Sequence, residues 1–418
     1  MNLRVGEDIT QMILKICKMN LIKIKDTEQR KALNAWAKSG YEGSVIAGTG
    51  FGKSRIGVLA VAHAIKNSTT SIYKRYPKKA LVLVPTIQLQ DQFKEEMIKW
   101  GHEKILDRVD IVCYQSAHKI QDEEYCIVVC DEVHLGLSPI YRTFFEQNTY
   151  DKILCLTATL PEEEEYKELL LQLAPPVYTI SLDECVAKGL VAPYEIYCVP
   201  VELGEEERLE YKKYNKLFVQ MKYALGGFNA FQNAQAIMSG KMNGNKGAAA
   251  QFYNAIRGRK SVVQHAKFKI DRALEIINHY HNCKILTFSG SNDFTDLMCE
   301  CIDNSAVYHS KKTKKQREKA LEDFKNGDVN VLCSTKALNQ GFDIQKAEVG
   351  IIAGLDSKAL PMIQRIGRLI RKDGDKIGRI YILYVKDSQE EKWLNNAIKG
   401  LNNINRDVDL TNHFSNER

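Results

Sequence analysis

The feature that most constrains this chain is a glycine-rich segment, Ala47-Gly48-Thr49-Gly50-Phe51-Gly52-Lys53-Ser54. A short apolar run at 44–46 precedes it, and 55–62 has the apolar spacing of a helix. Strand, glycine-rich turn and helix in this order predict a loop whose backbone N–H groups bind phosphate. Lys53 is expected to reach the β- and γ-phosphates, and the Ser54 hydroxyl to bind Mg²⁺. The usual pattern opens with Gly, where this chain has Ala47.

The composition fits a soluble protein of several domains. The chain has 418 residues with a net charge of +7, which fits a polyanionic partner. No apolar run is long enough to span a membrane, and no signal-peptide pattern opens the chain, so we expect a cytoplasmic protein. The 11 cysteines form no Cys-x-x-Cys pair and are predicted to be reduced, mostly buried thiols. His279, His281 and Cys283 lack the second ligand pair that a metal site needs.

Apolar segments alternate with helical ones through the first half, which predicts a parallel, doubly wound sheet. The expected strands lie at 80–86, 109–116, 127–134 and 152–159. In the third of them, Asp131 and Glu132 follow four apolar residues and therefore lie at the carboxyl edge of a buried strand. With a phosphate loop upstream, Asp131 is expected to hold Mg²⁺ through water, and Glu132 to orient and deprotonate the attacking water.

The N-terminal segment is predicted to be a short helix followed by a strand at 21–25. A second helix, ahead of the phosphate loop, contains Gln29. An amide can donate and accept together, which suits the Watson–Crick edge of adenine. The alternative is a solvated glutamine on a helix.

The second half predicts another parallel sheet, without a phosphate loop, with strands at 283–289, 306–310, 329–335, 349–353 and 379–384. Several helices at about 203–275 are expected to be inserted before this sheet. Their lysines and aromatic residues indicate either a surface that contacts a nucleic-acid strand or an ordinary amphipathic bundle. With the crossing near residue 190, the expected domains are 1–185 and 186–418. The polar residues beyond 400 are expected to be disordered or loosely docked.

Three arginines recur every third residue in one predicted helix, namely Arg365, Arg368 and Arg371. They share roughly one face, and stacked like charges favour an anion opposite them. A γ-phosphate held between the two domains is such an anion, because an arginine finger stabilises its developing charge. The alternative is a basic helix that binds nucleic-acid phosphates.

The order of these motifs resembles a superfamily 2 helicase or translocase. They are Gln29, the phosphate loop, Val84-Pro85-Thr86, Asp131-Glu132-Val133-His134 and Thr157-Ala158-Thr159. The resemblance covers about residues 25–390 and implies two RecA-like domains in tandem, with ATP and Mg²⁺ as cofactors. It implies that Arg368 and Arg371 are the fingers and that Gln364 helps place the water.

The resemblance also implies the remaining site residues. Gly341 and Asp343 belong to the nucleotide site, although Gln345 stands where the family usually has Pro shortly after this acid. His134, Thr157 and Thr159 couple the nucleotide to motion. The residues expected to grip nucleic acid are Pro85, Thr86, Tyr114, Gln115, Ser289, Thr335 and Lys336.

The Asp-Glu-Val-His form is similar to compact DNA helicases that migrate branched junctions, including phage recombination helicases. The leading hypothesis is therefore an ATP-dependent DNA helicase or translocase, expected to be a monomer, that remodels forks and junctions in recombination, repair or replication. Family likeness suggests 3′ to 5′ movement. Two alternatives remain: an RNA helicase, and a nucleotide-switched DNA-binding motor subunit that does not unwind by itself.

Overall fold

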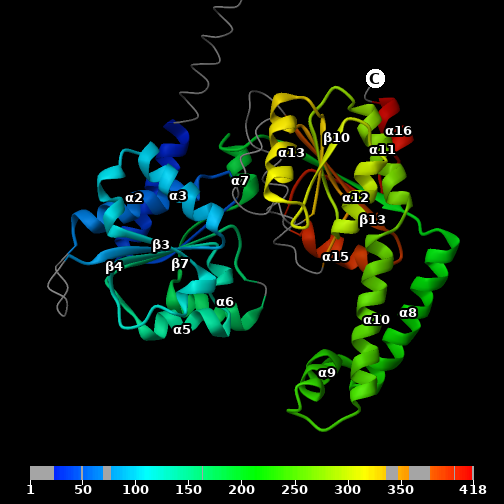
Figure 1. The fold of residues 1–418 in the computed structure, drawn as a ribbon, viewed down its shortest axis with the longest axis horizontal. Coiled ribbons are helices and arrows are strands. Elements are labelled where there is room, and N and C mark those ends of the chain that lie inside the picture. Colours follow the sequence, from blue (N-terminus) through cyan, green and yellow to red (C-terminus); the bar gives the residue numbers. More distant parts are fainter. Residues whose placement is uncertain are drawn as a thin grey trace, which may run out of the picture. The chain divides into compact units, whose positions relative to one another are not determined.

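The computed structural model describes residues 23–48, 50–68, 77–161, 163–335, 347–356, 377–399 and 401–416. These residues form two compact units, and the chain passes from the first to the second between Pro193 and Tyr194 (Figure 1). The crossing lies a few residues beyond the predicted boundary at 185/186. Each unit has its own sheet and its own hydrophobic core.

The first unit is built on a sheet in which every strand pair is parallel, as the alternation of apolar and helical segments predicts. Its strand order is β3-β2-β4-β6-β1-β7, with β5 paired to β4. The strands are β1 (Glu42–Ala47), β2 (Lys79–Val84), β3 (Val109–Cys113), β4 (Glu124–Asp131), β5 (Thr149–Tyr150), β6 (Ile153–Thr157) and β7 (Pro176–Ile180).

Helices cover both faces of this sheet, which explains why its strands are apolar throughout rather than alternating. On one face, α2 packs so closely that a Cβ on Gly57 would contact Val129 and Leu156. On the other face, Val128 and Cys130 pack in a cluster with residues of α5 and α6. Besides a helix at 23–38, the helices are α2 (Lys53–Lys66), α3 (Ile87–Lys99), α4 (Tyr114–Ala117), α5 (Pro139–Gln147), α6 (Glu164–Leu173) and α7 (Leu182–Ala187).

The second unit contains another all-parallel sheet, with the order β10-β11-β9-β12-β13-β8-β14. Its strands are β8 (Tyr194–Val201), β9 (Ile285–Phe288), β10 (Ser305–Tyr308), β11 (Val331–Ser334), β12 (Val349–Ile352), β13 (Gly378–Val385) and β14 (Ile404–Asn405). Both sheets therefore confirm the predicted architecture of two parallel α/β units in tandem.

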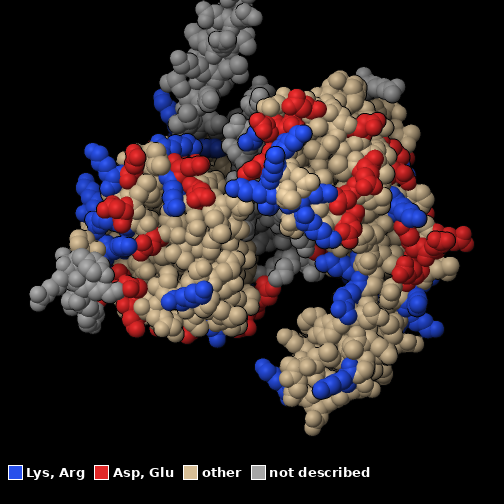
Figure 2. Space-filling view, viewed as in Figure 1, with Lys and Arg blue, Asp and Glu red and all other residues tan. Residues whose placement is uncertain are grey.

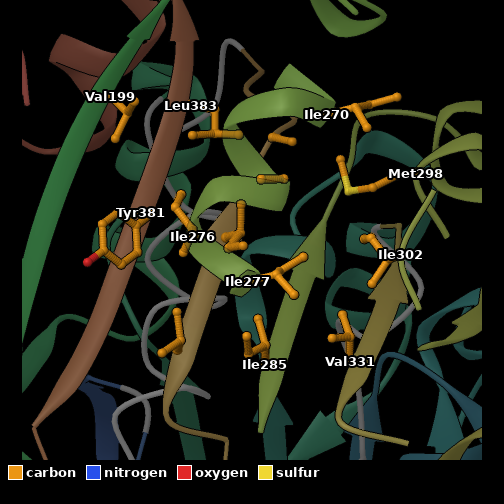
Figure 3. Close-up of a cluster of buried hydrophobic side chains, with 14 of the residues drawn as sticks. Val199, Ile270, Ile276, Ile277, Ile285, Met298, Ile302, Val331, Tyr381 and Leu383 are labelled. Atoms are coloured by element: carbon orange, nitrogen blue, oxygen red, sulfur yellow. The ribbon is translucent and has the colours of Figure 1, made fainter. Parts of the chain in front are cut away.

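The core of the second unit lies between this sheet and the helices α11, α12 and α16. Figure 3 shows Ile276 and Ile277 of α11 close to Ile285 and Tyr381 of the sheet. The helices that follow the strands are α11 (Phe268–His279), α12 (Asn292–Glu300), α13 (Lys314–Asn326), α15 (Gln389–Ala397) and α16 (Leu410–Asn416).

Three further helices of the second unit form a projection that we call the arm, residues 205–264 (Figure 1). They are α8 (Glu205–Ala224), α9 (Ala230–Met238) and α10 (Lys246–Gln264). The prediction of helices here is confirmed, but their predicted position is wrong. Strand β8 precedes them and belongs to the second sheet, so the arm is inserted after the first strand rather than before the sheet.

Three local predictions are also wrong. Residues 23–25 are helical rather than part of a strand. Strand β3 ends at Cys113, and the next residues form α4. The segment beyond 400 is docked: β14 pairs with β8, and Phe414 stacks on His279 with ring centroids 4.0 Å apart. The described cysteines are free thiols and mostly buried, as predicted. Within the described ranges, no helix combines the length and apolarity that crossing a membrane requires.

Candidate functional site

The carboxyl ends of β1, β4 and β6 place the predicted nucleotide residues together. These strands are neighbours in the sheet, with Ile46 paired to Thr157 and Asp131 paired to Leu156. The phosphate loop follows β1, and the acidic pair follows the strand next but one. The sequence motifs thus converge on one edge of the first unit, where ligands bind in open parallel sheets.

The loop owes its path to glycines in the left-handed region. Gly50 has φ 86° and Gly52 has φ 92°, conformations that residues with a Cβ adopt only with strain. A Cβ on Gly52 would also collide with the Gln29 amide. Helix α2 begins at the next residue, so its unpaired N–H groups lie at the end of the loop.

Lys53 is almost buried at the start of α2, and its ammonium donates to the Ala47 carbonyl at 2.9 Å. This hydrogen bond holds the charge against the loop instead of in solvent. Ser54, the second residue of the helix, is half-buried. Gly48 and Phe51 lie in the described part of the loop, with Phe51 fully buried, whereas Thr49 lies outside the described residues.

The acidic pair lies in two different backbone environments. Asp131 ends β4, and burial, reinforced by the neighbouring Glu132 charge and opposed by Lys53, raises the pKa of its carboxyl to about 7. Glu132 has φ 49° and ψ 54°, the left-handed region, which costs an ordinary residue of order 1 kcal/mol. Its carboxylate lies 3.6 Å from His134 Nδ1. Strain of this kind is tolerated where function requires the geometry.

These residues fit a magnesium ion. A hydroxyl and a carboxylate are the oxygen ligands that Mg²⁺ takes in proteins. Burial and the neighbouring Glu132 charge raise the pKa of Asp131, and the charge of a divalent cation would oppose both effects. Ser54 and Asp131 are therefore the residues that would hold the ion.

Gln29 supports the loop. Its side chain is buried, and its Nε2 donates to the carbonyls of Phe51 at 2.8 Å and Gly52 at 3.3 Å. Its Oε1 accepts a hydrogen bond from Arg55 at 2.6 Å. Both ends of the amide are thus bonded to the loop or to α2, and recognition of adenine by Gln29 stays a prediction.

A network around Gln29 escaped the sequence reasoning. Arg55 pairs with Asp26, and its guanidinium lies 4.2 Å from the centre of the Trp100 ring. Glu28 accepts hydrogen bonds from Lys31, Tyr178 and Lys188, which link the first helix to β7 and the end of α7. The sequence indicates these residues only through their neighbours, because Arg55 follows Ser54 and Glu28 precedes Gln29.

Among the residues predicted to grip nucleic acid, Pro85, Thr86 and Gln115 lie together. The Gln115 amide donates to the Pro85 carbonyl at 3.3 Å, because β2 and β3 are adjacent. The assignment of Tyr114 is wrong. Its ring is 1% exposed, and its hydroxyl donates to the Asp131 carbonyl at 2.9 Å, so it packs under the acidic pair.

The other described residues bond within their own unit. The Thr157 hydroxyl donates to the Thr159 carbonyl at 2.9 Å, which closes the turn after β6. The Thr335 hydroxyl donates to Asn292 at 3.0 Å. The side-chain assignment of Ser289 to nucleic acid is wrong, because its buried hydroxyl donates to the Ser291 carbonyl at the start of α12. The remaining predicted residues lie outside the described residues: Lys336, Gly341, Asp343, Gln364, Arg368 and Arg371.

Comparison with known families decides the relationship. A model described as "Type III restriction enzyme, res subunit" matches residues 22–162, and one described as "Helicase conserved C-terminal domain" matches residues 268–373. The DNA 3'-5' translocase XPB2 of Sulfurisphaera tokodaii is 26% identical over 369 residues, covering 84% of this chain and 79% of the relative. The chain belongs to the superfamily 2 helicases. This family consists of ATP-hydrolysing enzymes that act on nucleic acids.

Other relatives and solved structures show how far the similarity to known helicases extends. The ATP-dependent RNA helicase ROK1 of Scheffersomyces stipitis is 24% identical over 376 residues, covering 86% of this chain and 60% of the relative. The helicase domain of Pyrococcus furiosus Hef has the same fold, with TM-score 0.52 at 17% identity over 86% of this chain and 96% of that domain. The two units are thus tandem RecA-like domains. The chain spans 48% to 66% of three further relatives named as DNA 3'-5' helicases.

Proposed function

We propose that this chain is an ATP-driven translocase that acts on DNA and remodels branched DNA such as forks and junctions. The observation that carries the proposal is the convergence of Lys53, Ser54, Asp131 and the strained Glu132 on one sheet edge of a superfamily 2 helicase. The relative named as a DNA 3'-5' translocase supports DNA as the substrate and 3′ to 5′ as the direction.

In this proposal, each residue of the site has one task. The loop N–H groups and Lys53 bind the phosphates of ATP, and Ser54 with Asp131 would hold a magnesium ion, which would supply positive charge to the phosphates. Glu132 orients the attacking water and accepts its proton. Arg368 and Arg371, with Gln364, complete the site from the second domain. Domains 1–185 and 186–418 are then the two moving domains of the motor.

The test is the ATPase activity of the purified full chain with forked DNA, duplex DNA or structured RNA. We expect forked DNA to stimulate turnover most, and Lys53→Ala and Glu132→Gln to abolish the stimulated rate while DNA binding survives. Arg371→Ala is expected to lose hydrolysis but keep ATP binding. Near-normal turnover by Arg371→Ala would overturn the assignment of the finger.

The same assay discriminates the alternatives. The relative named ROK1 favours the RNA helicase as the second candidate. If structured RNA stimulates as strongly as forked DNA, the DNA assignment is wrong. Strand displacement by the chain alone separates a helicase from a motor subunit, since the latter would hydrolyse ATP on DNA without displacing a strand.

A further inference from the structure

The arm differs from the rest of the chain in its charge. Between Glu210 and Asp271 the sequence contains no Asp or Glu, although the chain as a whole carries 52 acidic residues among 418. No carboxylate of the same interval therefore offsets the charge of its lysines and arginines. Figure 2 shows basic but no acidic side chains on the visible outer part of the arm. The exposed lysines and arginines between Glu210 and Asp271 are Lys212, Lys213, Lys216, Lys222, Lys241, Lys246, Arg257 and Lys267.

Part of this charge forms a stripe along α8 that ends in an aromatic residue. Lys212, Lys216 and Tyr223 are separated by four and seven residues, so they share one face of the helix. The helix has 20 residues and extends for about 30 Å. Along this face of α8, the cationic side chains lie closer to the base of the arm and Tyr223 lies near its outer end.

The outer end of the arm exposes aromatic rings to solvent. Tyr223 is 88% exposed, and Phe228, which follows the left-handed Gly226 and Gly227, is 97% exposed. Large aromatic residues are ordinarily buried, and exposed ones that cluster mark a binding surface. Other exposed apolar side chains of the outer arm are Val219, Phe231, Met238 and Met242.

The outer arm is nevertheless a packed structure. Its own cluster includes Leu225, Ala234 and Phe252, separate from the cluster at the base. The rings of Phe218 and Phe252 stack with centroids 5.4 Å apart, and Asn233 donates to the Leu225 carbonyl at 2.9 Å, which fixes the glycine turn. The exposed rings are therefore held on a formed scaffold rather than left over from a core that failed to close.

We propose that the outer arm binds single-stranded DNA, with the α8 lysines on the phosphates and with Tyr223 and Phe228 stacking on unpaired bases. A partner with both negative charge and flat apolar faces matches this surface, and a single strand has both, whereas a duplex hides its base faces. An apolar protein groove would match the rings but would give no reason for the missing carboxylates. The proposal rests on the DNA motor proposed above for the choice of polyanion.

The test measures binding of a labelled single strand to the full chain by fluorescence anisotropy, without nucleotide. We expect Tyr223→Leu/Phe228→Leu to weaken binding by about ten-fold or more, because leucine keeps apolar area but has no face on which a base can stack. Tyr223→Phe/Phe228→Tyr is expected to bind like the unaltered chain. Wild-type affinity in the leucine variant, as an apolar protein-docking surface predicts, would overturn the proposal.

A salt titration tests the lysines. Lys212→Gln/Lys216→Gln is expected to reduce the slope of log K against log salt by about 1.4, since each phosphate contact on a single strand contributes about 0.7. Lys315→Gln/Lys319→Gln is a matched control: these lysines have the same spacing and exposure on α13. An equal change of slope in both double variants would mean that net charge alone sets the salt dependence, and it would overturn the proposal.

The two proposals fail in different ways. If no nucleic acid stimulates the ATPase of the unaltered chain, the proposed motor function fails. If DNA stimulates it, while the leucine variant keeps both its affinity and its stimulation, the motor stands and the role of the arm is wrong.

Discussion

Each unit has a lysine and a carboxylate near its sheet, but the two arrangements differ. In the second unit, Lys269 and Glu390 are both fully buried, and the ammonium lies 2.8 Å from each carboxylate oxygen. Glu390 also accepts from the Val385 N–H. In the first unit, Lys53 bonds to a carbonyl, and within the described residues Asp131 has no ion-pair partner. Breaking a satisfied buried pair leaves a charge uncompensated and destabilises the fold, whereas an unsatisfied pair is available to a ligand.

The largest expected effect concerns the unsatisfied pair. Lys53→Met should lower the rate of ATP hydrolysis by about 10³-fold or more, because the phosphates lose their main cation, while the thermal unfolding midpoint changes little. Phosphate release and differential scanning calorimetry measure the two quantities, with Lys315→Met as the control. Turnover above a tenth of the normal rate would contradict the comparison.

The satisfied pair should behave in the opposite way. Lys269→Met leaves the Glu390 charge buried without its partner and should lower the free energy of unfolding by about 3–5 kcal/mol. Lys269→Met/Glu390→Gln removes the charge and keeps an acceptor for Val385, so it should recover most of this loss. Urea denaturation measures both. A double variant no more stable than the single one would show that the pair does not act through its charges.

A third prediction concerns acid. Burial tends to raise the pKa of Glu28, but hydrogen bonds from Lys188, Lys31 and Tyr178 outweigh it and lower the pKa to about 2. Because the folded pKa lies below the unfolded value of 4.5, this stabilisation is present above pH 4.5 and is lost as pH falls toward 2.

Glu28→Gln should therefore cost about 2 kcal/mol at pH 6, and the difference from the unaltered chain should narrow by roughly half at pH 3. Urea midpoints at the two pH values measure it. A difference that stays constant with pH would mean that Glu28 contributes through packing and not through its charge.

The smallest effect is a gain in stability. The pKa of Asp131 is raised to about 7, above its unfolded value, so metal-free stability should decrease as pH rises from about 4 to about 7. Asp131→Asn lacks this titration and should be more stable by about 1 kcal/mol at pH 8 in the presence of a chelator, although it loses turnover. Glu95→Gln, which removes an exposed carboxylate on α3, is the control. A less stable Asp131→Asn would contradict the distinction between the two pairs.

Where the sequence predicted the fold well, the signal was local. Continuous apolar runs gave β2, β4 and β6, and glycines followed by Lys53 gave the loop and α2, because these depend on near neighbours. Tertiary contacts account for the failures. Residues 21–25 alternate like a strand, yet those that are described begin a helix. The polar C-terminal segment is held by pairing with β8 and by aromatic packing, neither of which its composition reveals.

For the candidate site, the residue types predicted where the residues lie in the fold but not what surrounds their side chains. Asp131 and Lys53 lie at the expected edge, since strand order brings motifs together. Tyr114 follows a strand just as Pro85 does, and only the packing of α4 against α5 shows that its ring is buried beneath Asp131. The hydrogen bonds of Gln29 to the loop are equally invisible in the sequence, because they join residues distant along the chain.

The position of β8 has a mechanical consequence. This strand begins at Tyr194, directly after the crossing from the first unit, and lies between β13 and β14 instead of at the edge of its sheet. It is paired with β13 along its whole length, from Tyr194 to Val201. A pull along the axis of β8 therefore loads these hydrogen bonds together in shear, rather than peeling them apart one after another. A connection anchored in this way can transmit tension between the halves of a motor without unravelling the half that it pulls.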